Sequence, residues 1–379
     1  MSGFSNSEFA EDTRLSAGRR LMMNLHIDVP LLLGLLLLLC TSIMIQYSAS
    51  DQDMDQIYKQ LVHFLVALFV MFAIAQVSPD TIEHWTPWIF GAVIITLIVV
   101  LTAGDVGKGA QRWLNLGFVK FQPSELMKIA LPMMVAWYLS ESTLPPRLSR
   151  IIVALGIILL PTILVAKQPD LGTAIILASA GIFVLFLAGL RWRIIISSFI
   201  LLIPMAWVLW QYGMHEYQRK RVLTLLSPES DPLGSGYHII QSTIAIGSGG
   251  VYGKGWLNGT QSHLDFLPER NTDFIFSVFS EEFGLLGSLL LLTIYVMIIA
   301  RGLIIAAQAQ DTFTRLLAGS ITLTFFTYVF INIGMVSGIL PVVGIPLPLV
   351  SNGGTSMVTL MAGFGILMSI QTHRKLIAS

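Results

Sequence analysis

The stretch VPLLLGLLLLLCTSIMIQYS, residues 29–48, is apolar over almost its whole length and decides the class of fold. A bilayer core of about 30 Å is crossed by about 20 residues of helix, so this run predicts a membrane-spanning helix. It is too long for the apolar part of a signal peptide and has no small-residue cleavage site, so we expect it to remain as an anchor. Residues 1–28, which are polar and carry three arginines, are predicted to form a cytoplasmic N-terminal tail.

Similar apolar runs recur along the chain of 379 residues, of which 54% are hydrophobic and 12% charged. This composition is typical of a polytopic membrane protein. The predicted fold is all-α, an integral membrane protein with about ten transmembrane helices in a domain over residues 29–372, followed by a cytoplasmic tail over 373–379. We place the spans at 29–48, 57–76, 86–103, 122–140, 151–167, 171–190, 194–212, 273–300, 314–338 and 353–371, with a large extracytoplasmic loop at about 213–272 between helices 7 and 8.

Charge and cysteine content exclude some functions and support one orientation. The 22 basic and 22 acidic residues leave no net field that would attract nucleic acid. The single cysteine, Cys40, excludes an intramolecular disulfide. The basic clusters RWR at 191–193 and HRK at 373–375 favour cytoplasmic N- and C-termini. Basic residues that this orientation places on the opposite side are candidates for binding an anion: Lys108, Arg112, Lys120, Lys128 and Lys167.

Four of these cations lie in the segment GDVGKGAQRWLNLGFVKFQPSELMKIALP, from Gly104 to Pro132, together with a candidate helix start. Pro123 suits the first turn of a helix, where its missing N–H costs nothing. From that start Glu125 and Lys128 share one helical face. They either form an ion pair that lowers its own burial cost, or Lys128 faces a phosphate-bearing substrate together with Arg112 and Lys108.

Two further acids lie at the predicted mouths of spans. In AKQPDLGTAI, residues 166–175, Asp170 is either the cap of the next helix or part of a site. In LPERNTDFIFSVFSEE, residues 267–282, Asp273 is either a cap or a general base. Glu281 and Glu282 lie deeper in the same run, which predicts a wet cavity at this end of the helix, because acids within a span usually face a polar interior.

Two segments are predicted to cover this face of the protein. In GILPVVGIPLPLVSNGG, residues 338–354, the prolines are too close for a helix, so we expect irregular backbone that forms a re-entrant wall. There Ser351 or Asn352 either contacts the substrate or forms a structural turn. The amphipathic basic stretch 218–226 is expected to lie over the membrane, where its cations bind lipid headgroups or a substrate.

Several segments, taken in order, resemble the SEDS family of shape, elongation and division proteins, and are most similar to its rod-shape branch. They are KGAQRWLNLG, FQPSELMKIA, QPDLGT, DPLGSGYHIIQS, FLPERNTDFIFSVFSEE and NIGMVSGILPVVGIPLPLVSNGG, which together run over nearly the whole chain. The resemblance implies a peptidoglycan glycosyltransferase in the bacterial inner membrane, which polymerises the lipid-linked disaccharide lipid II. It also implies a partner, a class B penicillin-binding transpeptidase, beside other membrane proteins of the elongation complex.

The resemblance also assigns roles to residues of this chain. Asp273 matches the family's essential aspartate, Glu125 and Lys128 match its conserved acid and lysine, and Asp170 matches the aspartate of QPDLGT. One departure is Asn352, which stands where the family usually has tyrosine.

These residues predict a mechanism in which Asp273 accepts the proton of the attacking hydroxyl. The charge of the leaving pyrophosphate is balanced either by cations or by a divalent ion, Mg²⁺ or Mn²⁺, held by Glu125 or Asp170. The expected substrate contacts are Arg112, Lys108, Lys120, Lys128, Asp170, Arg270, Ser351 and Asn352. Two other functions remain open, a lipid II flippase and a non-catalytic scaffold, although the acids gather near one face rather than along a whole path.

Overall fold

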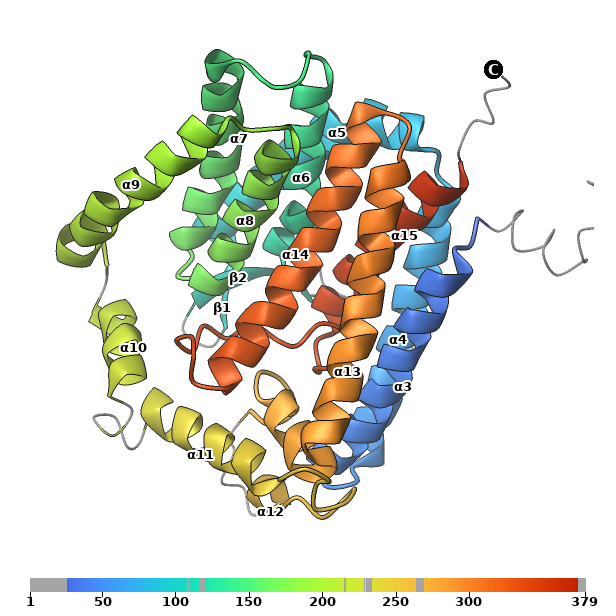
Figure 1. The fold of residues 1–379 in the computed structure, drawn as a ribbon, viewed down its shortest axis with the longest axis vertical. Coiled ribbons are helices and arrows are strands. Elements are labelled where there is room, and N and C mark those ends of the chain that lie inside the picture. Colours follow the sequence, from blue (N-terminus) through green and yellow to red (C-terminus); the bar gives the residue numbers. More distant parts are fainter. Residues whose placement is uncertain are drawn as a thin grey trace, which may run out of the picture.

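In this computed structural model, long helices run side by side in one bundle (Figure 1). The structure describes residues 26–107, 110–115, 120–214, 216–227, 229, 234–263 and 269–373. The helices of the bundle are α3 (Val29–Ala49), α4 (Met54–Ala75), α5 (Pro79–Ala103), α6 (Pro123–Ser140), α7 (Leu148–Ala166), α8 (Leu171–Leu187), α9 (Trp192–Val208), α13 (Ile275–Gln308), α14 (Thr312–Val336) and α15 (Gly354–Thr372).

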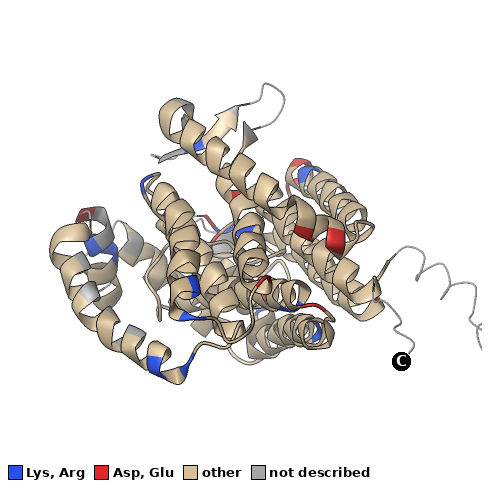
Figure 2. Cartoon of the chain, turned by 90° about the horizontal axis from the view of Figure 1, so that it is seen from above, with Lys and Arg blue, Asp and Glu red and all other residues tan. Residues whose placement is uncertain are grey.

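Each of these helices overlaps one of the predicted runs, so the order of the elements agrees with the sequence. Seven described helices are long and apolar enough to cross a membrane, namely α3, α4, α5, α7, α13, α14 and α15. The apolar α8 is shorter, with 17 residues. Charged residues are sparse along the ribbon (Figure 2), as expected for helices that face lipid or one another. The protein therefore has the character of a multi-pass membrane protein.

Local sequence explains where several helices begin. Asp28 caps α3 by accepting a hydrogen bond from the N–H of Leu31 at 3.0 Å. Asp53 and Ser78 cap α4 and α5 in the same way. Pro123 stands in the first turn of α6, as predicted. These starts satisfy backbone N–H groups that would otherwise lack partners at a helix end.

The bundle is organised around a few close pairs of helices. α4 packs along α15, and α13 packs along α14 and α3. α6 contacts α5, α7, α8 and α14, and its buried face includes Met127, Leu131 and Ala136. Residues of α6 are therefore surrounded by other helices, which places Glu125 and Lys128 inside the protein.

The connections contain structure that the sequence did not predict. Between α5 and α6 the chain forms a small antiparallel sheet of β1 (Asp105–Gly107), β2 (Ala110–Asn115) and β3 (Lys120–Phe121). Beyond α9 a π-helical turn, η2 (Leu209–Gly213), leads into the large loop. That loop contains α10 (Glu216–Leu226), α11 (Ser235–Ser248) and α12 (Thr260–His263). Figure 1 shows α9, α10 and α11 following one another along one side of the bundle.

Helix α13 is broken near its start, and the large loop fills the break. Gly284 has a left-handed φ of 64° and a ψ of −161°. The N–H groups of Leu285 and Leu286, which the break frees, donate to the carbonyls of Gly250 and Val251 at 2.9 and 3.1 Å. Irregular backbone at membrane depth is tolerated when protein groups satisfy it in this way.

The prediction that Glu281 and Glu282 face a wet cavity is wrong, although Asp273 at the same end of α13 does line a cavity. The carboxylate of Glu281 is fully buried and accepts hydrogen bonds from Lys254 Nζ at 2.7 Å and from the N–H of Thr260 at 2.9 Å. Glu282 is also buried and accepts a hydrogen bond from the hydroxyl of Ser48. Glu281 and one carboxylate oxygen of Glu282 thus have partners from distant segments, and these contacts fasten the loop and α3 to the first part of α13.

We expect Gly253→Ala to destabilise this junction. Gly253 has a φ of +79°, and a Cβ there would lie 2.1 Å from the carbonyl oxygen of Glu282. Overpacking against fixed backbone typically costs about 1–3 kcal/mol, to which the left-handed conformation adds strain. Thermal unfolding of the purified protein in detergent should show a lower midpoint than wild type.

The matched control is Gly247→Ala, because a Cβ at Gly247 meets nothing within 4 Å. This variant should unfold at the wild-type temperature or slightly above it, since alanine favours helix. Equal midpoints for the Gly253 and Gly247 variants would contradict the close backbone approach described here.

Candidate active site

Most of the predicted site residues that the structure describes gather along three adjoining cavities. The outer cavity, of about 410 Å³, is lined by residues that include Arg112, Asp170, Arg221, Glu269, Asp273 and Asn352. The middle cavity, of about 220 Å³, is lined by residues that include Arg112, Gln122, Glu125, Lys128, Asp170 and Tyr328. The inner cavity, of about 30 Å³, is lined by residues that include Glu125, Lys128, Thr324 and Tyr328. Shared lining residues make the three cavities one series.

Asp273 lies in the turn that precedes α13, and its side chain lines the outer cavity. The N-cap position of α13 is Phe274, which makes no side-chain capping bond, so Asp273 does not cap this helix. Its backbone is held by the buried Asn332, whose Nδ2 donates to the carbonyl of Asp273 at 2.8 Å. The carboxylate is therefore presented to the cavity from a fixed backbone position.

The segment between α14 and α15 forms the irregular wall that the prolines predicted. Asn332 also donates to the carbonyl of Ile345 at 2.8 Å, which ties this wall to Asp273. Gly344 adopts a φ of +75°, and a Cβ there would lie 3.4 Å from Oδ2 of Asp273. A glycine at this point lets the backbone of the wall turn directly beside the carboxylate.

The two predicted contacts at the end of this wall have different roles. Ser351 is buried, donates to the carbonyl of Thr272, and accepts from the N–H of Leu347 at 2.8 Å. Its hydroxyl is used inside the protein, so the structural turn is the interpretation that the geometry favours. Asn352 lines the outer cavity, and its N–H donates to the carbonyl of Asn271 at 2.9 Å.

Arg112 and Asp170 stand between the outer and middle cavities. Nη2 of Arg112 donates to the carbonyl of Pro169 at 2.7 Å, and its Nε lies 3.6 Å from Oδ2 of Asp170. Oδ1 of Asp170 accepts from the N–H of Thr173 at 3.2 Å, so this acid does cap α8. Its other oxygen accepts from Nε2 of Gln122 at 3.3 Å. Asp170 is thus both a helix cap and a wall of the cavities.

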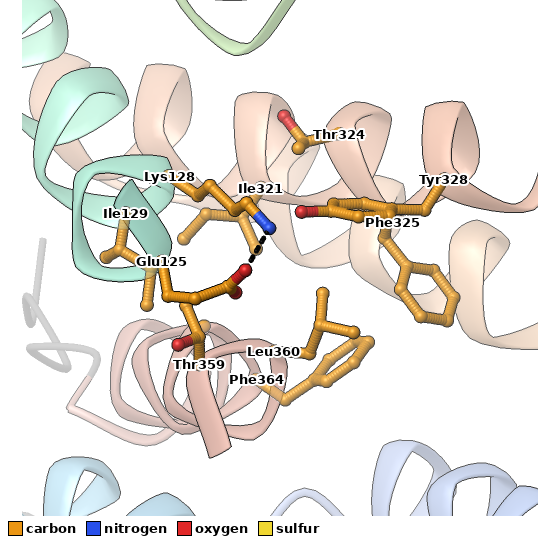
Figure 3. A pocket seen from close by; sticks show the side chains of 11 residues that line it. Glu125, Lys128, Ile129, Ile321, Thr324, Phe325, Tyr328, Thr359, Leu360 and Phe364 are labelled. Carbon is orange, nitrogen blue, oxygen red and sulfur yellow. Dashed lines mark hydrogen bonds and ion pairs between the residues drawn. The ribbon is translucent and has the colours of Figure 1, made fainter. Parts of the chain in front are cut away.

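Glu125 and Lys128 form an ion pair deep in the series (Figure 3). Lys128 Nζ lies 2.7 Å from Oε1 of Glu125, and each side chain is only 9% exposed. The ammonium also lies 5.1 Å from the ring centroid of Tyr328 on α14. The second carboxylate oxygen of Glu125 has no hydrogen-bond partner among the described residues. A pair kept at this depth, where separating its members would be costly, gives the site a fixed electrostatic environment.

Three other predicted residues are not placed at these cavities by the structure. Arg270 forms an ion pair with Asp51, which follows α3, and is absent from the lining of the three cavities. Lys120 lies in β3, but its side chain is outside the described part of the structure. Lys108 lies wholly outside the described residues. Arg270 therefore has a structural partner, while the two lysines stay predictions.

The sequence interpretation also missed several lining residues. Trp113, which follows Arg112 in the chain, lines the middle cavity. Gln122, which belongs to the quoted segment FQPSELMKIA, and Tyr328, which nothing in its local sequence distinguishes, line it too. Gly344 stands between prolines that did mark an irregular segment, and Arg221 belongs to a basic stretch that was noted without a definite role. Their common feature is position in space rather than any sequence pattern.

A resident metal ion does not fit the acids of this site. Among the described residues, no group of three or more His, Cys, Asp or Glu side chains is placed to hold a metal ion. Glu125 already contacts Lys128, and Asp170 lies beside Arg112. The basic side chains that line the three cavities, in the part of the chain that the structure describes, are Arg112, Lys128 and Arg221.

Comparison with known proteins defines the family. A family model described as "Cell cycle protein", which covers FtsW, RodA and SpoVE, matches residues 20–376. The chain therefore belongs to this family, the SEDS family that its motifs resemble. The peptidoglycan glycosyltransferase MrdB of Escherichia coli strain K12 is 56% identical over 353 residues, which cover 93% of this chain and 95% of that protein.

Solved structures agree with the family and the fold. A chain from a structure titled "Structural coordination of polymerization and crosslinking by a peptidoglycan synthase complex" is 31% identical, with a TM-score of 0.80, covering 91% of this chain and 97% of that one. The crystal structure of the rod shape determining protein RodA of Thermus thermophilus is 25% identical, with a TM-score of 0.70, covering 92% and 98%. The arrangement of helices is thus that of RodA.

The ion pair between Glu125 and Lys128 can be tested through stability. Removing one partner leaves the other buried and unpaired, at a cost of about 3–5 kcal/mol. We expect Glu125→Gln and Lys128→Met to lower the thermal unfolding midpoint, and the double variant to recover most of that loss. If the losses of the single variants simply add in the double variant, the two side chains do not interact as described.

Proposed function

We propose that this protein polymerises lipid II into glycan strands at the outer face of the bacterial inner membrane, with Asp273 as the general base. It is a peptidoglycan glycosyltransferase of the SEDS family, by its identity to curated relatives over most of the chain. The observation that carries the catalytic part is the position of Asp273. Its carboxylate lines a cavity of about 410 Å³ that also contains Arg112 and adjoins the buried Lys128.

The reaction requires a sugar hydroxyl of the acceptor to attack the anomeric carbon of the donor. A carbon–oxygen bond forms there while the bond to the lipid pyrophosphate breaks, and the electron pair leaves with the pyrophosphate. In our proposal Asp273 accepts the hydroxyl proton, a step typically worth about 10²- to 10⁴-fold in rate. The backbone of the wall turns beside this carboxylate at Gly344, and a carboxylate in a fixed position would help to hold the acceptor in line.

The pyrophosphate acquires negative charge as it leaves, and cations must stabilise that charge. Arg112 lies between the outer and middle cavities, so it can contact the phosphates directly. Lys128 is held by Glu125 further in, and contributes a positive potential from a fixed position.

The lipid tail of the substrate requires an apolar surface close to these cations. An almost wholly apolar cavity of about 310 Å³ lies between α4, α5, α6 and α15. Ile129 on α6 lines both this cavity and the inner cavity beside Lys128. We propose that the tail lies along this surface, where its hydrocarbon replaces membrane lipid.

The topology and partner expected from the sequence belong to the same proposal. About ten spans with both termini in the cytoplasm would place the Asp273 end of the bundle on the outer side. The partner is a class B penicillin-binding transpeptidase, beside other membrane proteins of the elongation complex. Likeness to a chain of a synthase complex that couples polymerization and crosslinking supports such a partner.

Replacing Asp273 by Asn should abolish polymerisation while the protein is still made and folded. The amide keeps the shape of the side chain but accepts no proton at neutral pH, so we expect a loss of about 10²-fold or more. Purified protein, with and without the transpeptidase, is given labelled lipid II and the glycan strands are separated by length. The matched control is Asp55→Asn, an exposed acid at the start of α4, which should leave strand formation unchanged.

Near-normal strand formation by the Asp273 variant would refute the role of this residue. If wild-type protein forms no strands under any condition, while vesicles that contain it move labelled lipid II across the bilayer, the flippase hypothesis replaces the polymerase.

The same assay separates a catalytic from a structural role of the buried ion pair. The double variant of Glu125→Gln and Lys128→Met should regain stability but not polymerisation, because the positive potential beside the pyrophosphate is gone. Wild-type strand formation by a stable double variant would show that the pair serves folding alone.

A further inference from the structure

Helix α10 carries three consecutive basic residues, Arg219, Lys220 and Arg221. Their side chains lie in three different environments. Nη2 of Arg219 donates to the carbonyl of Gln211 in η2 at 2.8 Å. Lys220 is exposed. Arg221 is half-buried and lines the outer cavity that contains Asp273. Of the three, Arg221 is the one whose position bears on the chemistry.

The packing of α10 determines which of its faces meets the cavity. Thr224 follows Arg221 by three residues and is 1% exposed, so these two lie on the inner face of the helix. Leu223 and Leu226 are 52% and 75% exposed on other faces. α10 packs on α11, and Figure 1 shows it beside the bundle, between α9 and α11. Arg221 therefore approaches the cavity from the large loop, whereas Arg112 approaches it from the sheet before α6.

The balance of charged residues in the outer cavity explains why a second arginine is needed to bind a diphosphate there. Its described lining includes three acids, Asp170, Glu269 and Asp273, and two bases, Arg112 and Arg221. Arg112 is already engaged by Asp170 and by the carbonyl of Pro169. A diphosphate brings further negative charge into this acid-rich space, and one engaged cation does not balance it.

We propose that Arg221 and Arg112 bind the diphosphate of the lipid-linked donor from two sides of the outer cavity. A guanidinium group offers paired N–H donors that match phosphate oxygens, and it stays charged at any physiological pH. This inference rests on the proposed function and adds to it a substrate-binding residue supplied by the large loop. It also means that the loop contributes directly to the site, through a helix outside the bundle.

The test compares Arg221→Ala, Arg221→Lys and the matched control Lys220→Ala with wild-type protein. All four proteins are reconstituted into vesicles of one fixed lipid composition. A charged hydrogen bond is worth about 1.5–3 kcal/mol, so Arg221→Ala should lower kcat/KM for lipid II about 10- to 100-fold. Lysine restores the charge but not the paired donors, so Arg221→Lys should be intermediate. Lys220→Ala should stay within about twofold of wild type, because an exposed lysine contributes little.

A binding measurement that needs no turnover supplies a second readout. Inorganic pyrophosphate should raise the thermal unfolding midpoint of wild type, of Lys220→Ala and of Asp273→Asn, but raise that of Arg221→Ala much less. Equal stabilisation of Arg221→Ala and wild type would overturn the proposal. So would a loss of activity that disappears in membranes without anionic lipid, since Arg221 would then bind headgroups.

Failure of this inference can be distinguished from failure of the proposed function. If wild type forms strands that Asp273→Asn does not, and Arg221→Ala forms them normally, only the role of Arg221 is refuted. If the wild-type protein forms no glycan strands at all, the proposed polymerase function is refuted, whatever the Arg221 variants do.

Discussion

The absence of water at membrane depth is the constraint on which this structure depends. A backbone or side-chain polar group placed there must find its partner within the protein. Two irregular segments meet that condition with hydrogen bonds from distant parts of the chain. The large loop fills the break at Gly284, and the wall between α14 and α15 is held by Asn332. The wall adjoins Asp273, so an irregular segment held by partners within the protein is also the part that presents the carboxylate.

The charges of the site obey the same constraint, and their side chains become more exposed toward the outside. Lys128 and Glu125 form a closed pair, whose side chains are each 9% exposed. Arg112 lies at 3.6 Å from Asp170 and is about one-third exposed. In the outer cavity Asp273 and Arg221 are only partly buried. A fixed inner charge and more accessible outer groups suit a reaction in which a charged diphosphate enters, reacts and leaves.

Much of the fold follows from local sequence. The apolar runs predicted the seven described helices that are long and apolar enough to cross a membrane, because burying about 20 apolar residues in lipid needs no information from elsewhere in the chain. Pro123 marked the start of α6 and the spacing of Glu125 and Lys128 placed them on one face. The surroundings of Glu281 and Glu282 in α13 were predicted wrongly, because their partners come from distant parts of the chain. Glu281 meets Lys254 and Thr260 through a loop whose path no local pattern reveals.

The sequence by itself determined the membrane-spanning class and the order of the long apolar helices, and it singled out Asp273, Glu125, Lys128 and Asp170 as candidate site residues. These properties depend on hydrophobicity and charge within a single helix or at its end. Only the tertiary structure decided that Arg221, Tyr328 and Gly344 share cavities with them, and that Ser351 and Arg270 are occupied by internal partners. Contacts between residues far apart in the chain depend on how the helices pack and on the path of each loop. A local sequence pattern specifies neither of these.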